Sequence, residues 1–247
     1  MAGYKSKYGY GDIETGLGQP PALYPGIPAE ENVLRWGFIR KVYGILSVQL
    51  ALTTLVSAIV VFTPAITGFL QSNSWSLIFI SILPLILMCP LYYYHQSHPI
   101  NLVLLGLFTV AISLTVGIVC ALTEGIIVLE ALILTAAVVV SLTAYTYWAA
   151  SKGYDFSYLG PILFVGVIIL ILFGIIQTFF PLGPISMTIY GVLSSLIFSA
   201  YIIYDTDNLI KRYTYDEFIW ASVALYLDVI NLFLSLLEIL RSIQSDN

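Results

Sequence analysis

The chain of 247 residues is 59% hydrophobic and only 9% charged, whereas soluble domains contain roughly 45–50% apolar and about 25% charged residues. Nine Lys and Arg against 14 Asp and Glu give a formal net charge of -5, which argues against nucleic-acid binding. Composition therefore excludes a water-soluble domain and indicates a protein whose partner is the lipid bilayer.

The first 38 residues are polar and rich in Gly, Pro and Tyr. They contain no apolar core of the kind found in a cleavable signal peptide. We predict a flexible cytosolic tail over residues 1–38. The basic residues Arg35, Arg40 and Lys41 then mark the start of a membrane domain over residues 39–247.

Seven apolar runs follow, and each is long enough to cross ~30 Å of hydrocarbon at about 1.5 Å per residue. The third and fourth runs are separated only by Thr123–Gly125, which predicts a helical hairpin. The predicted fold is an all-α membrane protein, a bundle of seven transmembrane helices. Its approximate helices are 42–62, 75–94, 100–122, 126–148, 161–180, 185–204 and 218–240.

The distribution of basic residues predicts the orientation of the chain. With seven crossings, the amino-terminal tail and the loops on its side hold eight of the nine Lys and Arg, and the other side holds only Arg241. This bias places the amino terminus in the cytosol. If the seventh segment entered and left on the cytosolic face, all nine would share one side, so both positions of the carboxy terminus stay open.

Asp228 is the most informative residue of the seventh segment, because a charge at the bilayer centre costs about 2.5–3.5 kcal/mol on insertion scales. At 100° per residue, a narrow stripe of small and polar side chains surrounds it. The stripe consists of Ala221, Ala224, Asn231 and Ser235. We predict that it faces the bundle and that Tyr226, Phe233 and Leu237 point away toward lipid. The plainer alternative is that Asp228 satisfies a neighbouring Tyr or Ser.

Asp205 ends the sixth segment and lies on one helical face with Tyr201 and Ser194. A ridge of small residues beside this face predicts close approach of a neighbouring helix. The ridge consists of Gly191, Ser195 and Ser199. As an alternative, Asp205 merely caps the end of its helix at the level of the lipid headgroups.

The two segments are joined by a short loop, so we expect Asp205 and Asp228 to meet in one desolvated site. Two carboxylates so close together cannot both ionise cheaply, which predicts a shared proton. They are also hard ligands for Ca²⁺, but two fall short of the six to eight oxygens of a full site. We predict transient Ca²⁺ contact and no resident cofactor. Secondary candidates are Glu130, which could instead reach the interface, Glu238 and His95.

Two stretches, Ile203–Leu209 and Leu225–Phe233, resemble the carboxy-terminal signature of the Bax inhibitor motif family. Three further segments are similar to its lifeguard branch, and the amino-terminal part resembles the plant members. These segments are Arg40–Gly44, Val128–Ala131 and Tyr154–Ser157.

The resemblance implies a seven-helix fold in which the other helices surround the last one. It also implies a pH-sensitive Ca²⁺ leak across an internal membrane and suppression of programmed cell death, with the paired aspartates of the family at Asp205 and Asp228. The endoplasmic reticulum is the expected membrane. The Golgi, vacuolar and plasma membranes are alternatives.

The chain departs from the family at one position. In bacterial relatives an arginine near the end of the second helix pairs with the first aspartate, but Tyr92–His98 contains no arginine. Only His95 or His98 could supply a positive charge there, and histidine titrates near pH 6.5. The alternative is that both histidines are solvated at the interface.

The sequence is compatible with two functions and argues against a third. The first is a proton-sensitive Ca²⁺ leak, and the second is a non-conducting scaffold that suppresses cell death by binding membrane proteins through its tail or its last loop. The third, an enzyme, is not expected. Asp228 follows Tyr-Leu rather than the Gly-x-Gly of intramembrane aspartyl proteases, and two histidines cannot supply a hydrolytic metal cluster.

Overall fold

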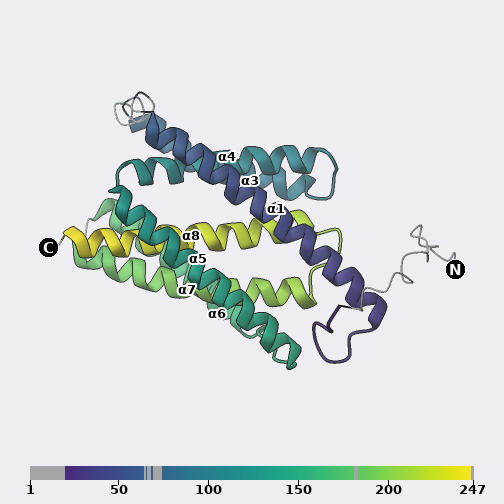
Figure 1. Ribbon diagram of the computed structural model, residues 1–247. Coiled ribbons are helices and arrows are strands. Elements are labelled where there is room, and N and C mark those ends of the chain that lie inside the picture. The colour runs from purple at the N-terminus through teal and green to yellow at the C-terminus, as the bar shows by residue number, and fades with distance from the viewer. Residues whose placement is uncertain (1–19, 64, 66–67, 69–73, 181–182, 246–247) are drawn as a thin grey trace.

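The computed structural model describes residues 20–63, 65, 68, 74–180 and 183–245. This part of the chain contains seven helices that are long and apolar enough to cross a membrane, as predicted for a multi-pass protein, and no strand. The helices run across the molecule in one bundle (Figure 1). They are α1 (Ala29–Phe62), α3 (Ser74–Tyr94), α4 (Ile100–Ala121), α5 (Gly125–Ser151), α6 (Leu159–Phe179), α7 (Pro184–Lys211) and α8 (Phe218–Ser245).

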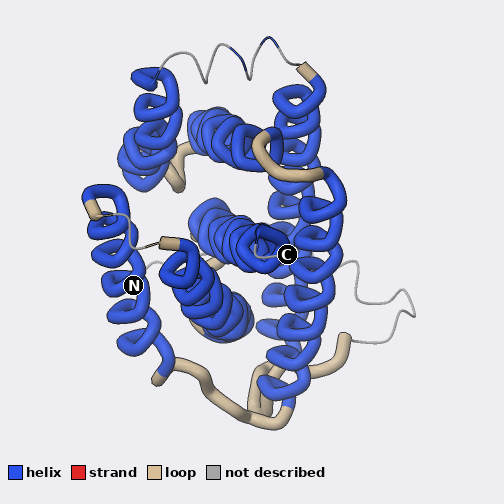
Figure 2. Tube along the Cα trace, turned by 90° about the vertical axis from the view of Figure 1, so that its left-hand side faces the viewer, coloured by secondary structure: helices blue, strands red, loops and turns tan. Residues whose placement is uncertain are grey.

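The last helix, α8, lies in the middle of the bundle, where it contacts α1, α4, α5 and α7. Figure 2 shows this helix, which ends at the carboxy terminus, with the others around it. The prediction that one side of α8 faces lipid was wrong, because Tyr226, Phe233 and Leu237 are all buried. An apolar face on a central helix packs against other helices instead of acyl chains.

The helix α1 begins at Ala29, well before the predicted start at residue 42. Residues 29–38 therefore form helical turns and are not part of a flexible tail. Pro28 precedes them in an extended conformation, and Glu30 and Glu31 lie in the first turn, where their charge complements the helix dipole. Residues 1–19 of the predicted tail lie outside the described residues.

The helix α7 continues to Lys211, seven residues beyond its predicted end. Leu209 and Ile210 are fully buried in this extension, so tertiary packing holds the charged stretch in a helix. Asp205 consequently lies inside the helix and does not cap it. The helix α8 likewise runs five residues past its predicted end, whereas α3, α4, α5 and α6 match within three residues.

The helices α7 and α8, which carry the two aspartates, approach closely near the start of α7 and the end of α8. A Cβ atom built on Gly191 would lie 2.9 Å from Ile239 Cγ1 and 3.2 Å from the Ser235 carbonyl oxygen. The hydroxyl groups of Ser194 and Ser235 hydrogen-bond across the same contact at 2.5 Å. Gly191 thus makes the predicted close approach, but the Ser195 hydroxyl bonds to the Val192 carbonyl of its own helix.

Replacing Gly191 by valine is expected to push α7 away from α8, because the added side chain would overlap Ile239 and the Ser235 backbone. Overpacking of this kind destabilises by about 1–3 kcal/mol. Thermal unfolding of the purified chain in detergent measures the loss. Gly37→Val is the matched control, since a Cβ there meets nothing within 4 Å, and equal loss in both variants would contradict the packing account.

Candidate di-aspartate site

The helices α7 and α8 bring Asp205 and Asp228 together, as the sequence predicted. The side chains are buried, with 7% and 5% of their residue surface exposed. The two carboxyl groups are close enough to interact, and Asp228 Oδ2 is buried without a hydrogen-bond partner. Because a carboxylate has no donor, a hydrogen bond between the two groups requires that one of them carries a proton.

Two tyrosines border the carboxyl pair. Tyr201, one turn before Asp205 on α7, lies close enough to interact electrostatically with both aspartates. Tyr213, in the loop after α7, is also near them, and burial followed by the charges of Asp205 and Asp228 raises the pKa of its phenol. Tyr213 therefore remains a neutral hydroxyl at this end of the site.

The predicted polar stripe on α8 is only partly assembled around Asp228. Ser235 bonds to Ser194 of α7 and to the Asn231 carbonyl oxygen of its own helix at 2.6 Å. The Asn231 amide donates to the Leu227 carbonyl oxygen at 2.8 Å, one turn back on α8. Asn231 thus satisfies the backbone of its own helix, and no hydrogen bond joins it to Asp228 among the described contacts.

The structure does not bring the secondary candidates to the pair. Glu130 is exposed near the start of α5. Glu238 lies 3.8 Å from Arg241 of the same helix. His95 bonds through Nδ1 to the Tyr92 carbonyl oxygen, and its ring stacks on Tyr92 at a centroid distance of 5.8 Å.

A polar chain that the sequence analysis missed leads from Asp205 to the end of α7. Asn208 Nδ2 donates to Asp205 Oδ1 at 3.3 Å, and Arg212 Nη1 donates to Asn208 Oδ1 at 2.6 Å. Arg212 therefore connects a positive charge to the first aspartate through one amide. The spacing of these residues by three and four on one helix was a signal available in the sequence.

Asp207 is a second missed residue, because its neighbours became visible only in the folded chain. It is fully buried, forms an ion pair with Lys211 and lies 3.7 Å from Arg212 Nη2. Its Oδ2 also accepts the Phe156 backbone N–H at 3.3 Å. Asp207 thus ties the loop between α5 and α6 to the end of α7.

Arg212 reaches the same loop through Asp155, with which it forms an ion pair. The pKa of Asp155 lies below its usual value, first because the Ser157 backbone N–H donates to its carboxylate and then because Arg212 is close. Both side chains are partly exposed, so water screens this pair more than the buried one at Asp207.

The loop between α7 and α8 is held over the site by α1. Arg35, buried on the part of α1 predicted to be tail, donates from Nη1 to the Tyr213 carbonyl oxygen at 2.5 Å. Its guanidinium also lies over the Tyr215 ring, 4.8 Å from the centroid. The early turns of α1 thus anchor the loop that follows Asp205.

Within the described residues, no cluster of three or more His, Cys, Asp or Glu side chains could hold a metal ion. The carboxyl pair provides fewer oxygen ligands than a Ca²⁺ storage site uses. A cation that meets this pair would keep part of its hydration shell.

Comparison with known proteins identifies the family. The sequence model described as inhibitor of apoptosis-promoting Bax1 matches residues 35–246, which include both aspartates. The chain belongs to the Bax inhibitor family. It is 63% identical over 96% of its length to a BI1-like protein of Arabidopsis thaliana, covering 91% of that protein.

The chain is also similar in sequence to other members of the family. The chain is 58% identical to Protein LIFEGUARD 4 of Arabidopsis thaliana, over 94% of the chain and 95% of the relative. It is 37% identical to the Golgi anti-apoptotic protein of vaccinia virus strain Lister, over 84% of the chain and 86% of the relative. These matches confirm the resemblance to lifeguard proteins and to plant members of the family.

Removing the buried carboxylate of Asp207 is expected to leave Lys211 without its ion-pair partner, so that only the Tyr154 carbonyl oxygen accepts from its ammonium group. Breaking a buried ion pair from one side destabilises by roughly 3–5 kcal/mol. We expect Asp207→Asn to lower the thermal stability of the chain in detergent and Asp207→Asn/Lys211→Met to recover part of the loss. A double variant less stable than the single one would show that Lys211 acts independently of Asp207.

Proposed function

We propose that this protein is a proton-sensitive Ca²⁺ leak of an internal membrane and that Asp205 and Asp228 form its ion-contacting site. The observation that carries the proposal is the meeting of two buried carboxyl groups between membrane-spanning helices. Charged groups at membrane depth are costly and commonly belong to ion or proton pathways. The carboxylates supply the charge, and no catalytic step is involved.

Proton sensitivity follows from the same contact. When the pair shares one proton, a hydrogen bond joins α7 to α8 and the site carries one negative charge. When both groups ionise, they repel each other and form a better site for a divalent cation. The balance between protons and Ca²⁺ therefore sets how the site is occupied.

A biological role in restraining cell death is supported by the names of the relatives. The family is described as inhibiting apoptosis-promoting Bax1, and the vaccinia virus relative is named a Golgi anti-apoptotic protein. A slow leak that lowers the Ca²⁺ content of a store would damp death signals that depend on release from it. We propose the endoplasmic reticulum as that store and a cytosolic amino terminus, which the distribution of Lys and Arg favours.

Asn208 and Arg212 take the place, in this proposal, of the arginine missing from the second helix. Arg212 places its charge near Asp205 through the Asn208 amide. Arg212 holds the Asn208 amide, and that amide in turn holds the Asp205 carboxyl group in one orientation. We call Asn208 and Arg212 the latch. Both residues lie at the end of α7.

The proposal predicts that Ca²⁺ flux through proteoliposomes varies with pH and that each carboxylate is needed for this dependence. Asp205→Asn and Asp228→Asn each remove one carboxyl group of the pair, so in either variant the remaining group has no carboxyl partner with which to share a proton. We expect several-fold lower flux in both variants and a nearly flat dependence of flux on pH, because a single carboxyl group has no second one with which to share a proton. A fluorescent Ca²⁺ indicator inside the vesicles measures the flux.

Glu130→Gln is the matched control, because it removes one exposed carboxylate from another membrane helix. It should leave both the flux and its pH profile unchanged. Wild-type flux in Asp205→Asn and Asp228→Asn would contradict the leak mechanism. That result would favour a non-conducting role through contacts with other membrane proteins.

The Asn208 amide can be removed without changing Asp205 or Arg212. Asn208→Leu keeps a similar side-chain volume but removes the hydrogen bonds to Asp205 and Arg212. We expect the pH profile of flux to shift while the protein stays folded and monodisperse, because Asp205 loses its link to a positive charge. An unchanged profile would show that Asn208 has only a structural role.

A further inference from the structure

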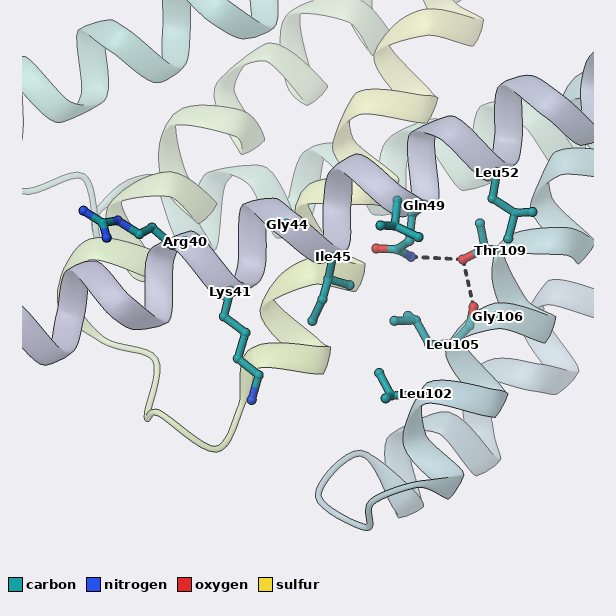
Figure 3. Close-up of a pocket in the computed structure, with 11 residues that line it drawn as sticks. Arg40, Lys41, Gly44, Ile45, Gln49, Leu52, Leu102, Leu105, Gly106 and Thr109 are labelled. Carbon is teal, nitrogen blue, oxygen red and sulfur yellow. Dashed lines mark hydrogen bonds between the residues drawn. The ribbon is translucent and has the colours of Figure 1, made fainter. Parts of the chain in front are cut away.

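A groove between α1 and α4 has the features of a site for an amphiphile. Its volume is about 360 Å³, within the range of pockets that hold small ligands. Figure 3 shows Arg40 and Lys41 at one end, with their side chains pointing in different directions, and the hydrogen bond between Gln49 and Thr109 at the other. The groove is thus basic at its mouth and apolar along its walls.

Two glycines create the space. Gly44 of α1 and Gly106 of α4 both line the groove, and a Cβ built on either would meet nothing within 4 Å. Ile45 and Leu105 form the apolar walls beside them. Because these walls lie on membrane-spanning helices, the hydrocarbon chains of lipids are in a position to fill the groove.

The mouth of the groove carries more positive than negative charge. Arg40 is exposed and forms no ion pair or hydrogen bond in the described part of the chain. Lys41 is exposed as well, and its ammonium group lies over the Phe218 ring, 3.1 Å from the centroid. Asp216 is the acidic residue near Lys41, and the two form no ion pair. A cation over a ring keeps donors free for a second partner.

Gln49 provides a second polar feature inside the groove. It is 3% exposed, and its Nε2 donates to Thr109 Oγ1 at 3.1 Å. Its Oε1 has no hydrogen-bond partner and turns toward the basic end in Figure 3.

We propose that this groove binds an anionic phospholipid from the surrounding bilayer, with its phosphate at Arg40 and Lys41 and an acyl chain between Gly44 and Gly106. Basic side chains at the end of a membrane helix attract anionic headgroups. The site is separate from the carboxyl pair and involves different helices, so the lipid is a partner distinct from Ca²⁺ and protons. It would bind against α1, which also anchors the loop over Asp205 through Arg35.

Native mass spectrometry of the full-length chain, released from detergent micelles, tests this site. The probes are dioleoyl phosphatidic acid and dioleoyl phosphatidylcholine, which have equal chains and different headgroups. We expect the first bound phosphatidic acid to be favoured on the order of tenfold, the size that two basic side chains near a headgroup provide. Arg40→Gln/Lys41→Gln should remove this preference, whereas Lys152→Gln, which neutralises an exposed lysine outside the groove, should keep it.

A second pair of variants tests the apolar part. Gly106→Leu fills the groove and should reduce retention of both lipids, while Gly37→Leu, at an exposed position outside it, should not. If Gly106→Leu does not fold, the headgroup variants still decide the question. Equal binding of the two lipids, loss of preference in Lys152→Gln, or displacement of the lipid by inorganic phosphate alone would overturn the proposal.

Discussion

Two carboxyl groups held against each other inside a membrane bundle are the constraint on which the rest of the structure depends. Each would be expensive to insert alone, and the folded chain buries Asp205 and Asp228 beside each other. The contact requires α7 and α8 to lie close together, which Gly191 permits and the bond between Ser194 and Ser235 fixes. It also requires α8 to be central, so that Asp228 never meets lipid.

The ends of the helices around this pair are organised by charge. Asp207 joins Lys211 and the loop between α5 and α6, and Arg212 links Asp155 to the Asn208 amide that contacts Asp205. Arg35 fixes the neighbouring loop through the Tyr213 carbonyl oxygen. The carboxyl pair is therefore connected through Asn208 to Arg212 and Asp155, two side chains that are partly exposed.

Much of this fold was predictable, because long apolar runs separated by Pro, Gly and polar residues define membrane helices by length alone. Helical phasing also identified Asp228, since few polar residues compete with it in the last segment. The first turns of α1 were missed because residues 29–38 are too polar to resemble a membrane span. They are helical because Asn32, Arg35 and Phe38 are buried against other parts of the chain, which no local pattern reveals.

The network around Asp205 illustrates the same limit. The sixth helix was predicted to end at residue 204, whereas Leu209 and Ile210 pack in the core and keep the charged residues around them in a helix up to Lys211. Lipid exposure of Tyr226 was predicted from one helix alone, but its hydroxyl bonds to Thr53 of α1 at 2.7 Å. Such partners lie far apart in the sequence, so only the assembled bundle determines which polar groups are satisfied.

Infrared spectroscopy of the full-length chain in lipid can detect a proton shared between Asp205 and Asp228. Protonated carboxyl groups have a C=O stretching band that is separate from that of carboxylates. A band present at neutral pH in the wild type and absent in Asp228→Asn, but retained in Glu130→Gln, is the result that the account predicts. A wild-type spectrum without a protonated carboxyl band at neutral pH would contradict it.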